Sequence, residues 1–361
     1  METVSNSIQK NLNYLNRTLN HIVFLTPGFA PNEQDTTTIP AMQVYLKALK
    51  NGLPETQITI IAFQYPYKKE VYNWNGCQVI ALNGGNKIFQ RIFIWQKAFQ
   101  ILKALHRENP ISILHSFWLG ECAFVGHWFS KRNQLKHLVT LMGQDALKKN
   151  GYTRILPIKK MQLITISHFQ EQIFYKNYNT QTTLIPWGIN LEDFSHSTEK
   201  NIDIIGVGSL TSLKNYELFI DAIYELNQKK PIKAIIIGDG IQKELLQKKI
   251  VALGLEKVIV LKGLLSHNET LSLIAKSKIL LHTSNYESFG LVFAEAFQCK
   301  TRIVSKKIGV AFDSQNWAIG ENKTEMIAAC EKFLLTTFAE NEENPFTIDK
   351  TVQAYLKIYH E

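Results

Sequence analysis

The segment Glu287-Ser288-Phe289-Gly290-Leu291-Val292-Phe293-Ala294-Glu295-Ala296 decides how the fold of this chain is interpreted. It follows the apolar run 279–282, which is typical of a strand buried on both faces of a sheet. The glycine predicts a turn into a helix, with Glu295 about one turn inside that helix. Unpaired backbone N–H groups at such a helix start can bind an anion. The segment therefore predicts a strand–turn–helix unit with an anion site at its turn.

Units of this kind recur in two series along the chain. Strands are predicted at 22–26, 58–63, 79–82, 111–115, 138–141 and 163–166, and again at 202–207, 234–237, 258–261, 279–282 and 303–304. Helical patterns lie between them, among them 41–50, 87–107, 216–228, 243–253, 268–275 and 291–298. Such alternation predicts an α/β fold in which parallel sheets are covered by helices.

The length of 361 residues exceeds the usual size of one hydrophobic core and favours two domains. The segment 185–190, Ile-Pro-Trp-Gly-Ile-Asn, interrupts the strand–helix rhythm, so we place the boundary there. We expect two Rossmann-like, doubly wound domains, 1–186 and 187–340, which would face a cleft at the carboxyl ends of their strands.

Composition and charge indicate the cellular compartment and the kinds of partner that suit the protein. The four cysteines are far apart and form no C-x-x-C pattern, which favours a reducing compartment and argues against a disulfide framework or zinc site. The first 20 residues are polar, and no apolar run is long enough to span a bilayer, so a cytoplasmic location is expected. Residues 1–186 contain 20 Lys and Arg residues but only 9 Asp and Glu residues. Residues 187–361 contain 20 Lys and Arg residues and 22 Asp and Glu residues, so the excess of positive charge lies in the first half. The basic first half would suit an anionic membrane surface or a phosphorylated acceptor; a solvated lysine-rich surface is the alternative.

The predicted helix 87–107 is amphipathic. Its apolar residues include Ile92, Trp95, Phe99, Leu102 and Leu105, and its polar side is basic. A helix of this kind can cover one face of a sheet, can lie in a bilayer interface, or can do both.

The segment 287–296 resembles the E-x-F-G-L-V-x-x-E-A stretch of retaining family 4 glycosyltransferases, which have the GT-B fold. The resemblance extends over about residues 20–360 and is strongest from 202 to 297. It implies that Glu287 contacts the donor sugar and that Glu295 binds the ribose hydroxyls of the nucleotide. It also places the backbone of Gly290 and Leu291 at the pyrophosphate, with Ser288 and Phe289 beside them in the donor site.

Two further segments of the second half match the same family. In Ile204-Ile205-Gly206-Val207-Gly208-Ser209-Leu210, followed by Lys214, the lysine falls at the family's pyrophosphate lysine. Gly208 and Ser209 belong to this donor loop, and Ser209 replaces the family's usual arginine, so one cation is lost. Leu264, after Gly263, falls where the family contacts the nucleobase. Gly238-Asp239-Gly240 is interpreted as a structural turn, because G-D-G alone is a weak nucleotide signal.

The first half matches the family less closely. Gly28 follows the first strand, where the family has a loop near the reaction centre. His115 ends a predicted strand and is a catalytic candidate, although the family's own histidine position is Phe117; a structural, hydrogen-bonded role is the alternative. Asp145, in a turn where Met142 replaces the family histidine, could orient a cation or hydroxyl. Residues 341–361 resemble the closing helix that crosses back to the first domain.

These resemblances imply a retaining glycosyltransferase of the hexosyltransferase type. It would use a UDP- or GDP-sugar, with Glu287, Lys214 and His115 as catalytic residues, and would need no cofactor because no D-x-D or metal-ligand cluster occurs. The acceptor would be a glycan or lipid-linked hydroxyl in surface polysaccharide, lipopolysaccharide or glycolipid synthesis. We expect cytoplasmic placement, at most peripheral on the inner face of the plasma membrane, and no nucleic-acid partner.

Other functions remain open at this point. One is a nucleotide-sugar epimerase, which would need no acceptor. Another is a degenerate, non-catalytic protein of the same fold that binds a sugar nucleotide or a partner. Ser209, Phe117 and Met142 favour this second alternative, whereas Glu287, Glu295 and Lys214 count against it. A dehydrogenase is more distant, since neither half contains a complete G-x-G-x-x-G.

Overall fold

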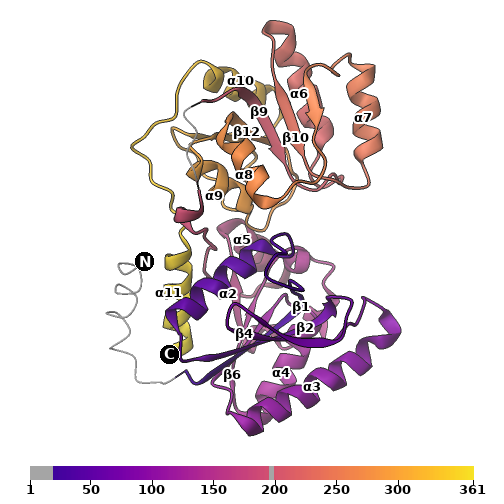
Figure 1. The fold of residues 1–361 in the computed structure, drawn as a ribbon, viewed down its shortest axis with the longest axis vertical. Coiled ribbons are helices and arrows are strands. Elements are labelled where there is room, and N and C mark those ends of the chain that lie inside the picture. Colours follow the sequence, from indigo (N-terminus) through magenta and orange to yellow (C-terminus); the bar gives the residue numbers. More distant parts are fainter. Residues whose placement is uncertain (1–18, 195–198) are drawn as a thin grey trace. The chain divides into compact units, whose positions relative to one another are not determined.

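The computed structural model describes residues 19–194 and 199–361, which belong to two compact units (Figure 1). Unit 1 comprises the chain up to Gly188 together with 348–361, and unit 2 comprises Ile189–Thr347. Each unit contains one sheet covered by helices.

The sheet of unit 1 has eight strands in the order β3-β4-β2-β1-β5-β6-β7-β8. Their bounds are β1 (His21–Gly28), β2 (Gln57–Tyr65), β3 (Glu70–Trp74), β4 (Cys77–Ala81), β5 (Ile113–Phe117), β6 (Lys136–Thr140), β7 (Gln162–Thr165) and β8 (Thr183–Leu184). All neighbouring pairs are parallel except β3 and β4. The sequence prediction missed β3, which pairs with β4 through Asn75 and Gly76. Both residues have positive φ, and Asn-Gly is the usual signal of a two-residue hairpin turn.

The longer helices of unit 1 are α2 (Pro40–Gly52), α3 (Arg91–Glu108), α4 (Glu121–Asn133), α5 (His168–Tyr178) and α11 (Ile348–His360). Short 3₁₀ helices are η1 (Ile88–Gln90), η2 (Gln144–Ala146), η3 (Gly151–Arg154) and η4 (Ile158–Lys160). The helix α3 buries Ile94, Ala98, Leu102 and Leu105 in the core, so it covers the sheet as expected. The expectation that Ile92 belongs to its apolar side is wrong: Ile92 is 62% exposed, because the helical face that packs on the sheet runs through Ile94 and Ala98.

The last helix, α11, packs inside unit 1. Tyr359 hydrogen-bonds to Tyr45 of α2 at 2.9 Å between the two hydroxyl oxygens. The Tyr355 hydroxyl lies 2.9 Å from Thr140 Oγ1 and accepts a hydrogen bond from Trp187 Nε1. This buried aromatic and hydroxyl cluster attaches the chain's final segment to β6 and α2.

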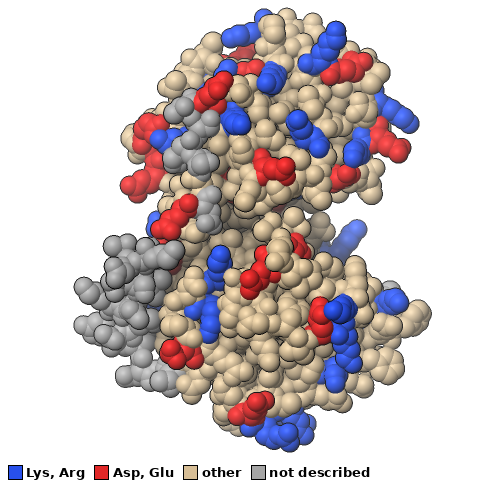
Figure 2. All heavy atoms as spheres, in the orientation of Figure 1, with Lys and Arg blue, Asp and Glu red and all other residues tan. Residues whose placement is uncertain are grey.

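The sheet of unit 2 has six parallel strands in the order β11-β10-β9-β12-β13-β14. They are β9 (Ile202–Val207), β10 (Ala234–Ile237), β11 (Ile259–Leu261), β12 (Ser277–His282), β13 (Arg302–Ser305) and β14 (Trp317–Ile319). The helices are α6 (Tyr216–Lys229), α7 (Lys243–Ala252), α8 (His267–Ala275), α9 (Leu291–Gln298) and α10 (Lys323–Leu334), with the 3₁₀ helix η5 (Leu191–Asp193). On the face of this unit that Figure 2 draws, cationic and anionic side chains are interspersed, in keeping with the small net charge of the unit.

The strand order of unit 2 defines one special place in the sheet. Strands β10 and β11 follow β9 in the sequence and lie on one side of it in the sheet. The next strands, β12, β13 and β14, lie on the other side of β9. The loops after β9 and β12 therefore leave the same edge of the sheet in opposite directions. Open α/β sheets bind ligands at this switch point, at the carboxyl ends of the strands.

Candidate active site

The loops after β9 and β12 are joined by hydrogen bonds. The backbone N–H of Asn285 donates to the carbonyl of Leu213 at 2.8 Å, and Ser284 Oγ donates to the same carbonyl at 3.2 Å. Thr283 Oγ1 donates to the carbonyl of Lys214 at 3.1 Å. The predicted donor residues Lys214 and Glu287, 73 residues apart in the chain, are thus brought together at the switch point.

Glu287 lies at the centre of a three-residue cluster. Its Oε1 atom accepts a hydrogen bond from Lys214 Nζ and another from His282 Nε2, the latter at 2.9 Å. The Lys214 and Glu287 side chains are 20% and 13% exposed, so this ion pair is largely removed from water but still reachable. The cluster presents one cation and one carboxylate beside the start of α9.

Electrostatics favour one set of protonation states in this cluster. Burial acts to raise the pKa of Glu287, but the hydrogen bonds from His282 and Lys214 and the charge of Lys214 outweigh it and lower the pKa to about 2. Burial lowers the pKa of His282 despite the opposing effect of Glu287. Glu287 is therefore ionised near neutral pH, and we assign His282 as a neutral imidazole that donates its Nε2–H.

The turn into α9 has the geometry that the sequence predicts. Gly290 has φ of 85° and immediately precedes the helix, and the first turn of α9 contains no acidic residue. The backbone approaches closely here: a Cβ at Gly309 would lie 2.2 Å from the Phe289 carbonyl oxygen, and Val310 N donates to that carbonyl at 3.0 Å. The N–H of Phe293 donates to the Gly290 carbonyl at 2.9 Å, and the N–H groups of Leu291 and Val292 precede the first regular helix bonds. The start of α9 is therefore a local positive end at the sheet edge.

Glu295 lies inside α9, as predicted, and is held by a histidine that the sequence prediction missed. His267 Nε2 lies 2.7 Å from Glu295 Oε1, and the Glu295 side chain is 7% exposed. His267 is the first residue of α8, whose start is fixed by a reciprocal capping box between Ser266 and Glu269. The carboxylate is thereby fixed in direction from a second helix.

The Gly238-Asp239-Gly240 turn has the close packing that its structural interpretation requires. A Cβ at Gly238 would lie 2.0 Å from the carbonyl oxygen of Gly208, and one at Gly240 would lie 2.5 Å from that of Leu210. The turn therefore supports the donor loop by direct backbone contact. In that loop Ser209 is exposed, and Leu264, after β11, is 73% exposed rather than packed into the unit.

In unit 1, His115 is completely buried on β5. Its Nδ1 lies 2.7 Å from the Tyr359 hydroxyl and its Nε2 lies 2.8 Å from Thr140 Oγ1. Burial, with a contribution from His137, lowers the pKa of His115 well below its usual value. With both ring nitrogens engaged and no exposed surface, these surroundings favour the structural alternative for His115.

Asp145 and Gly28 also have structural surroundings. The Asp145 carboxylate accepts hydrogen bonds from the backbone N–H groups of Leu119 and Gly143, each at 2.8 Å. Burial raises the pKa of Asp145, while these N–H groups act in the opposite direction. Gly28 ends β1 and is buried, and a Cβ there would lie 3.3 Å from Cβ of Tyr65.

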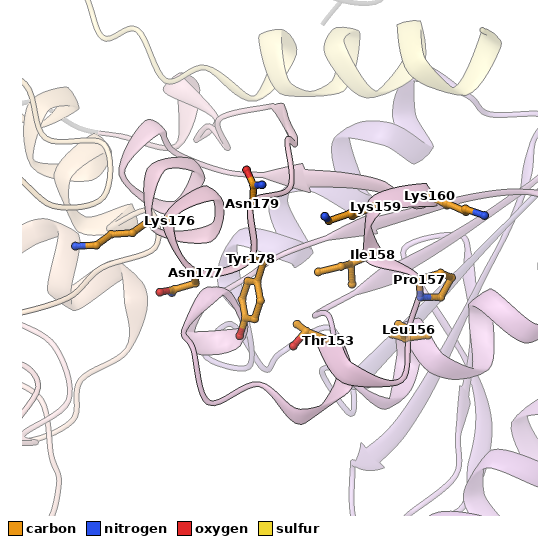
Figure 3. A pocket seen from close by; sticks show the side chains of 10 residues that line it. All are labelled: Thr153, Leu156, Pro157, Ile158, Lys159, Lys160, Lys176, Asn177, Tyr178 and Asn179. Carbon is orange, nitrogen blue, oxygen red and sulfur yellow. The ribbon is translucent and has the colours of Figure 1, made fainter.

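Two neighbouring pockets lie in unit 1, and one of them adjoins Asp145. One, of about 910 Å³, is lined in part by Asp145, Trp118 and Tyr152. The other, of about 650 Å³, is shown in Figure 3 and shares Lys176 and Asn177 with the first. In Figure 3, Tyr178 and Ile158 line this pocket while Lys160 and Lys176 extend away from its centre.

Comparison with known proteins identifies the domain that contains the cluster around Glu287. Residues 190–315 match the family model for glycosyl transferases group 1. They form a glycosyltransferase group 1 domain. Within these residues lie the predicted donor-site residues Gly208, Ser209, Lys214, Leu264, Ser288, Phe289, Gly290, Leu291, Glu287 and Glu295.

Individual relatives agree with this family. The chain is 24% identical over 297 residues to the uncharacterized glycosyltransferase MJ1178 of Methanocaldococcus jannaschii, covering 76% of this chain and 82% of that protein. It is 28% identical over 234 residues to the GPI3 subunit of phosphatidylinositol N-acetylglucosaminyltransferase from Saccharomyces cerevisiae, but this covers only 58% of this chain and 51% of that protein.

Solved structures show the fold over nearly the whole chain. Sucrose-phosphate synthase from Thermosynechococcus elongatus matches with a TM-score of 0.68 and 15% identity, covering 95% of each chain. Anabaena HepE in complex with UDP and glucose matches with a TM-score of 0.66 and 16% identity, covering 95% of this chain and 96% of that one. The expected GT-B fold and the expected enzyme class, a nucleotide-sugar glycosyltransferase, are confirmed.

Two residues of the glycosyltransferase domain were not predicted as part of its site. His282 is the last residue of β12, five positions before Glu287, so its place at a strand end was a signal that could have found it. His267 is 28 residues from Glu295, and no local pattern connects the two. Within residues 19–194 and 199–361, no cluster of three or more His, Cys, Asp or Glu side chains could hold a metal ion.

Proposed function

We propose that this glycosyltransferase moves a hexose from a nucleoside-diphosphate sugar to an acceptor hydroxyl with retention at the anomeric carbon, and that unit 2 binds the donor. The observation that carries this proposal is the Lys214–Glu287–His282 cluster at the switch point of the unit 2 sheet, beside the start of α9. The matched family model covers the same residues.

Lys214 is proposed to neutralise the pyrophosphate. The departing nucleoside diphosphate gains negative charge in the transition state, and a fixed cation lowers the energy of that state more than that of bound donor. The N–H groups at the start of α9 would bind the same phosphates, with Gly290 leaving room for close approach. Lys214 contacts Glu287 in this structure and would shift or share its contact when the diphosphate binds.

Glu287 and Glu295 are proposed to orient the donor through its hydroxyl groups. An ionised carboxylate only accepts hydrogen bonds, so Glu287 suits the hydroxyls of the sugar and Glu295 those of the ribose. His282 and His267 would then act as positioning residues, because each holds one oxygen of a glutamate and fixes its direction.

The acceptor is proposed to be a glycan or lipid-linked hydroxyl that binds to unit 1, in the synthesis of surface polysaccharide, lipopolysaccharide or glycolipid. The phosphatidylinositol-directed enzyme among the relatives supports a lipid-linked acceptor, and the basic sequence of the first half would suit its phosphate. HepE, which binds UDP and glucose, supports a UDP-sugar donor over a GDP-sugar.

Release of nucleoside diphosphate tests the proposal. The protein is incubated with UDP- and GDP-hexoses, with and without an extract of lipid-linked glycans, and free diphosphate is measured. A transferase releases diphosphate much faster with the extract. An epimerase would convert donor without any extract, and a degenerate protein would do neither, so either of these results overturns the proposal.

A further inference from the structure

Three large apolar side chains are exposed in η1 and in the first turn of α3, which follows it directly. Phe89, Ile92 and Phe93 are 92%, 62% and 70% exposed, respectively. The opposite face of α3 already packs on the core through Ile94, Ala98, Leu102 and Leu105, so these three residues are not needed to cover the sheet. Single exposed apolar residues are ordinary, whereas a contiguous group indicates an interaction surface.

The same outer face of α3 continues as a basic surface. Helical periodicity places Lys97, Lys103 and Arg107 in line with Phe93 and Ile92, and all three basic residues are exposed. Glu108, the final residue, is the only acidic residue of η1 and α3. We call Phe89, Ile92, Phe93, Lys97, Lys103 and Arg107 the α3 surface. Figure 1 shows α3 at the periphery of unit 1.

An aromatic row extends from α3 to the neighbouring helix α4. The Trp95 and Phe124 rings are 4.8 Å apart, and Phe124 lies 6.4 Å from Trp128, measured between ring centroids. Trp128 is 42% exposed, and Lys131 Nζ lies 5.3 Å from the centre of its ring. Tryptophan side chains are enriched at the boundary between lipid and water, because the ring is apolar and its N–H remains hydrated.

We propose that the α3 surface docks unit 1 on an anionic lipid bilayer. Phe89, Ile92 and Phe93 would enter the headgroup region, and Lys97, Lys103 and Arg107 would contact lipid phosphates, as in interfacial amphipathic helices. The charge of the α3 surface favours an anionic bilayer as its partner. The exposed apolar side chains are followed along the helix by Lys97, Lys103 and Arg107, with no acidic residue between them. None of the helices in the described residues is long and apolar enough to cross a membrane.

Co-sedimentation of the full chain with vesicles tests the docking. One set of vesicles is phosphatidylcholine alone and the other contains phosphatidylglycerol as well. The protein should sediment with the anionic vesicles only, and added salt should weaken the binding. Each of Lys97→Gln and Lys103→Gln should weaken binding about fivefold. The double variant Phe89→Ser/Phe93→Ser should weaken it by about tenfold or more.

The controls are substitutions of the same kinds, apolar residue to Ser and Lys to Gln, at exposed positions of unit 2. Ile241 and Leu245 are 91% and 50% exposed, and Ile241→Ser/Leu245→Ser should sediment like the original protein. Lys248→Gln and Lys257→Gln, both at exposed positions, control for net charge. Absence of sedimentation with anionic vesicles, an equal loss in the controls, or self-association that depends on Phe89 and Phe93 would overturn the proposal. Thermal stabilisation by nucleotide in the same samples reports on unit 2 separately, so failure of docking and failure of the proposed function are distinguishable.

Discussion

The imidazole of His282 and the carboxylate of Glu287 form a 2.9 Å hydrogen bond, and Lys214 contacts the same carboxylate oxygen. The Oε1 atom of Glu287 thus accepts two hydrogen bonds, while its Oε2 atom can accept a hydrogen bond from a bound molecule. The loops that hold Lys214 and Glu287 are joined by three hydrogen bonds to the Leu213 and Lys214 carbonyls, so the protein's own contacts fix the positions of the two side chains. Such preorganisation is what electrostatic catalysis requires.

Removal of the lysine charge should affect the chemical step. We expect Lys214→Gln to lower kcat by about 100- to 1,000-fold, since the leaving diphosphate loses a fixed positive partner. Steady-state release of nucleoside diphosphate measures this. Lys243→Gln is the matched control, because Lys243 forms an exposed ion pair with Asp239 after β10. Equal activity of the Lys214 and Lys243 variants would contradict the role of Lys214.

Acid should weaken the folded state through Glu287. Its pKa is about 2 in the folded protein against an ordinary value of 4.5. A lowered folded-state pKa stabilises the fold above pH 4.5, and this stability is lost as the pH falls from 4.5 towards 2. The full effect is about 3 kcal/mol. Urea unfolding between about pH 5 and pH 3 should therefore show a steeper loss for the original protein than for Glu287→Gln. Parallel pH profiles for the two proteins would rule out this contribution.

The histidine that holds Glu295 should influence donor binding more than chemistry. His267→Asn removes the 2.7 Å contact, and we expect the donor KM to rise about tenfold with little change in kcat. His168→Asn is the control, since His168 also contacts a glutamate, Glu171, but lies on α5 of unit 1 and is exposed. A fall in kcat at unchanged KM would show that His267 acts in the reaction itself.

His115 should matter for stability. Replacement by Phe leaves the Tyr359 and Thr140 hydroxyls without one buried partner and should cost about 1–3 kcal/mol of unfolding free energy. Donor binding should be retained, because every proposed donor contact lies in unit 2. Urea unfolding and nucleotide titration on the same variant separate the two roles. Unchanged stability with a collapse of kcat would restore the catalytic interpretation of His115.

The sequence predicted those features that are encoded locally. About 20 consecutive residues contain the strand before Glu287, the turn at Gly290 and the helix with Glu295. Their pattern is local, and α9 begins where the sequence predicts. The β3–β4 hairpin was also local, but its Asn75-Gly76 signal lay between two short, half-exposed strands and was missed.

Partners distant in the chain could not be predicted in this way. His267 meets Glu295 because α8 and α9 pack side by side, and His115 meets Tyr359 across 244 positions. The exposure of Ile92 depends on which face of α3 packs on the sheet, and the apolar pattern alone did not distinguish Ile92 from Ile94. Local motifs thus predict the residues of a site that lie close together in the sequence. Residues that hold them from elsewhere in the chain, such as His267, become apparent only from the packing of the helices.

Thermal unfolding of the original protein and of Glu295→Ala, each with a panel of nucleoside diphosphates and their sugars, tests the donor site of unit 2 directly. A ligand at about 100 times its Kd stabilises the folded state by about 2.7 kcal/mol, which a melting curve resolves. We expect a clear rise in Tm with one nucleotide, largest for a uridine diphosphate, and the loss of this rise in Glu295→Ala but not in His168→Asn. No rise with any nucleotide, or an equal rise in Glu295→Ala, would contradict the proposed donor site in unit 2.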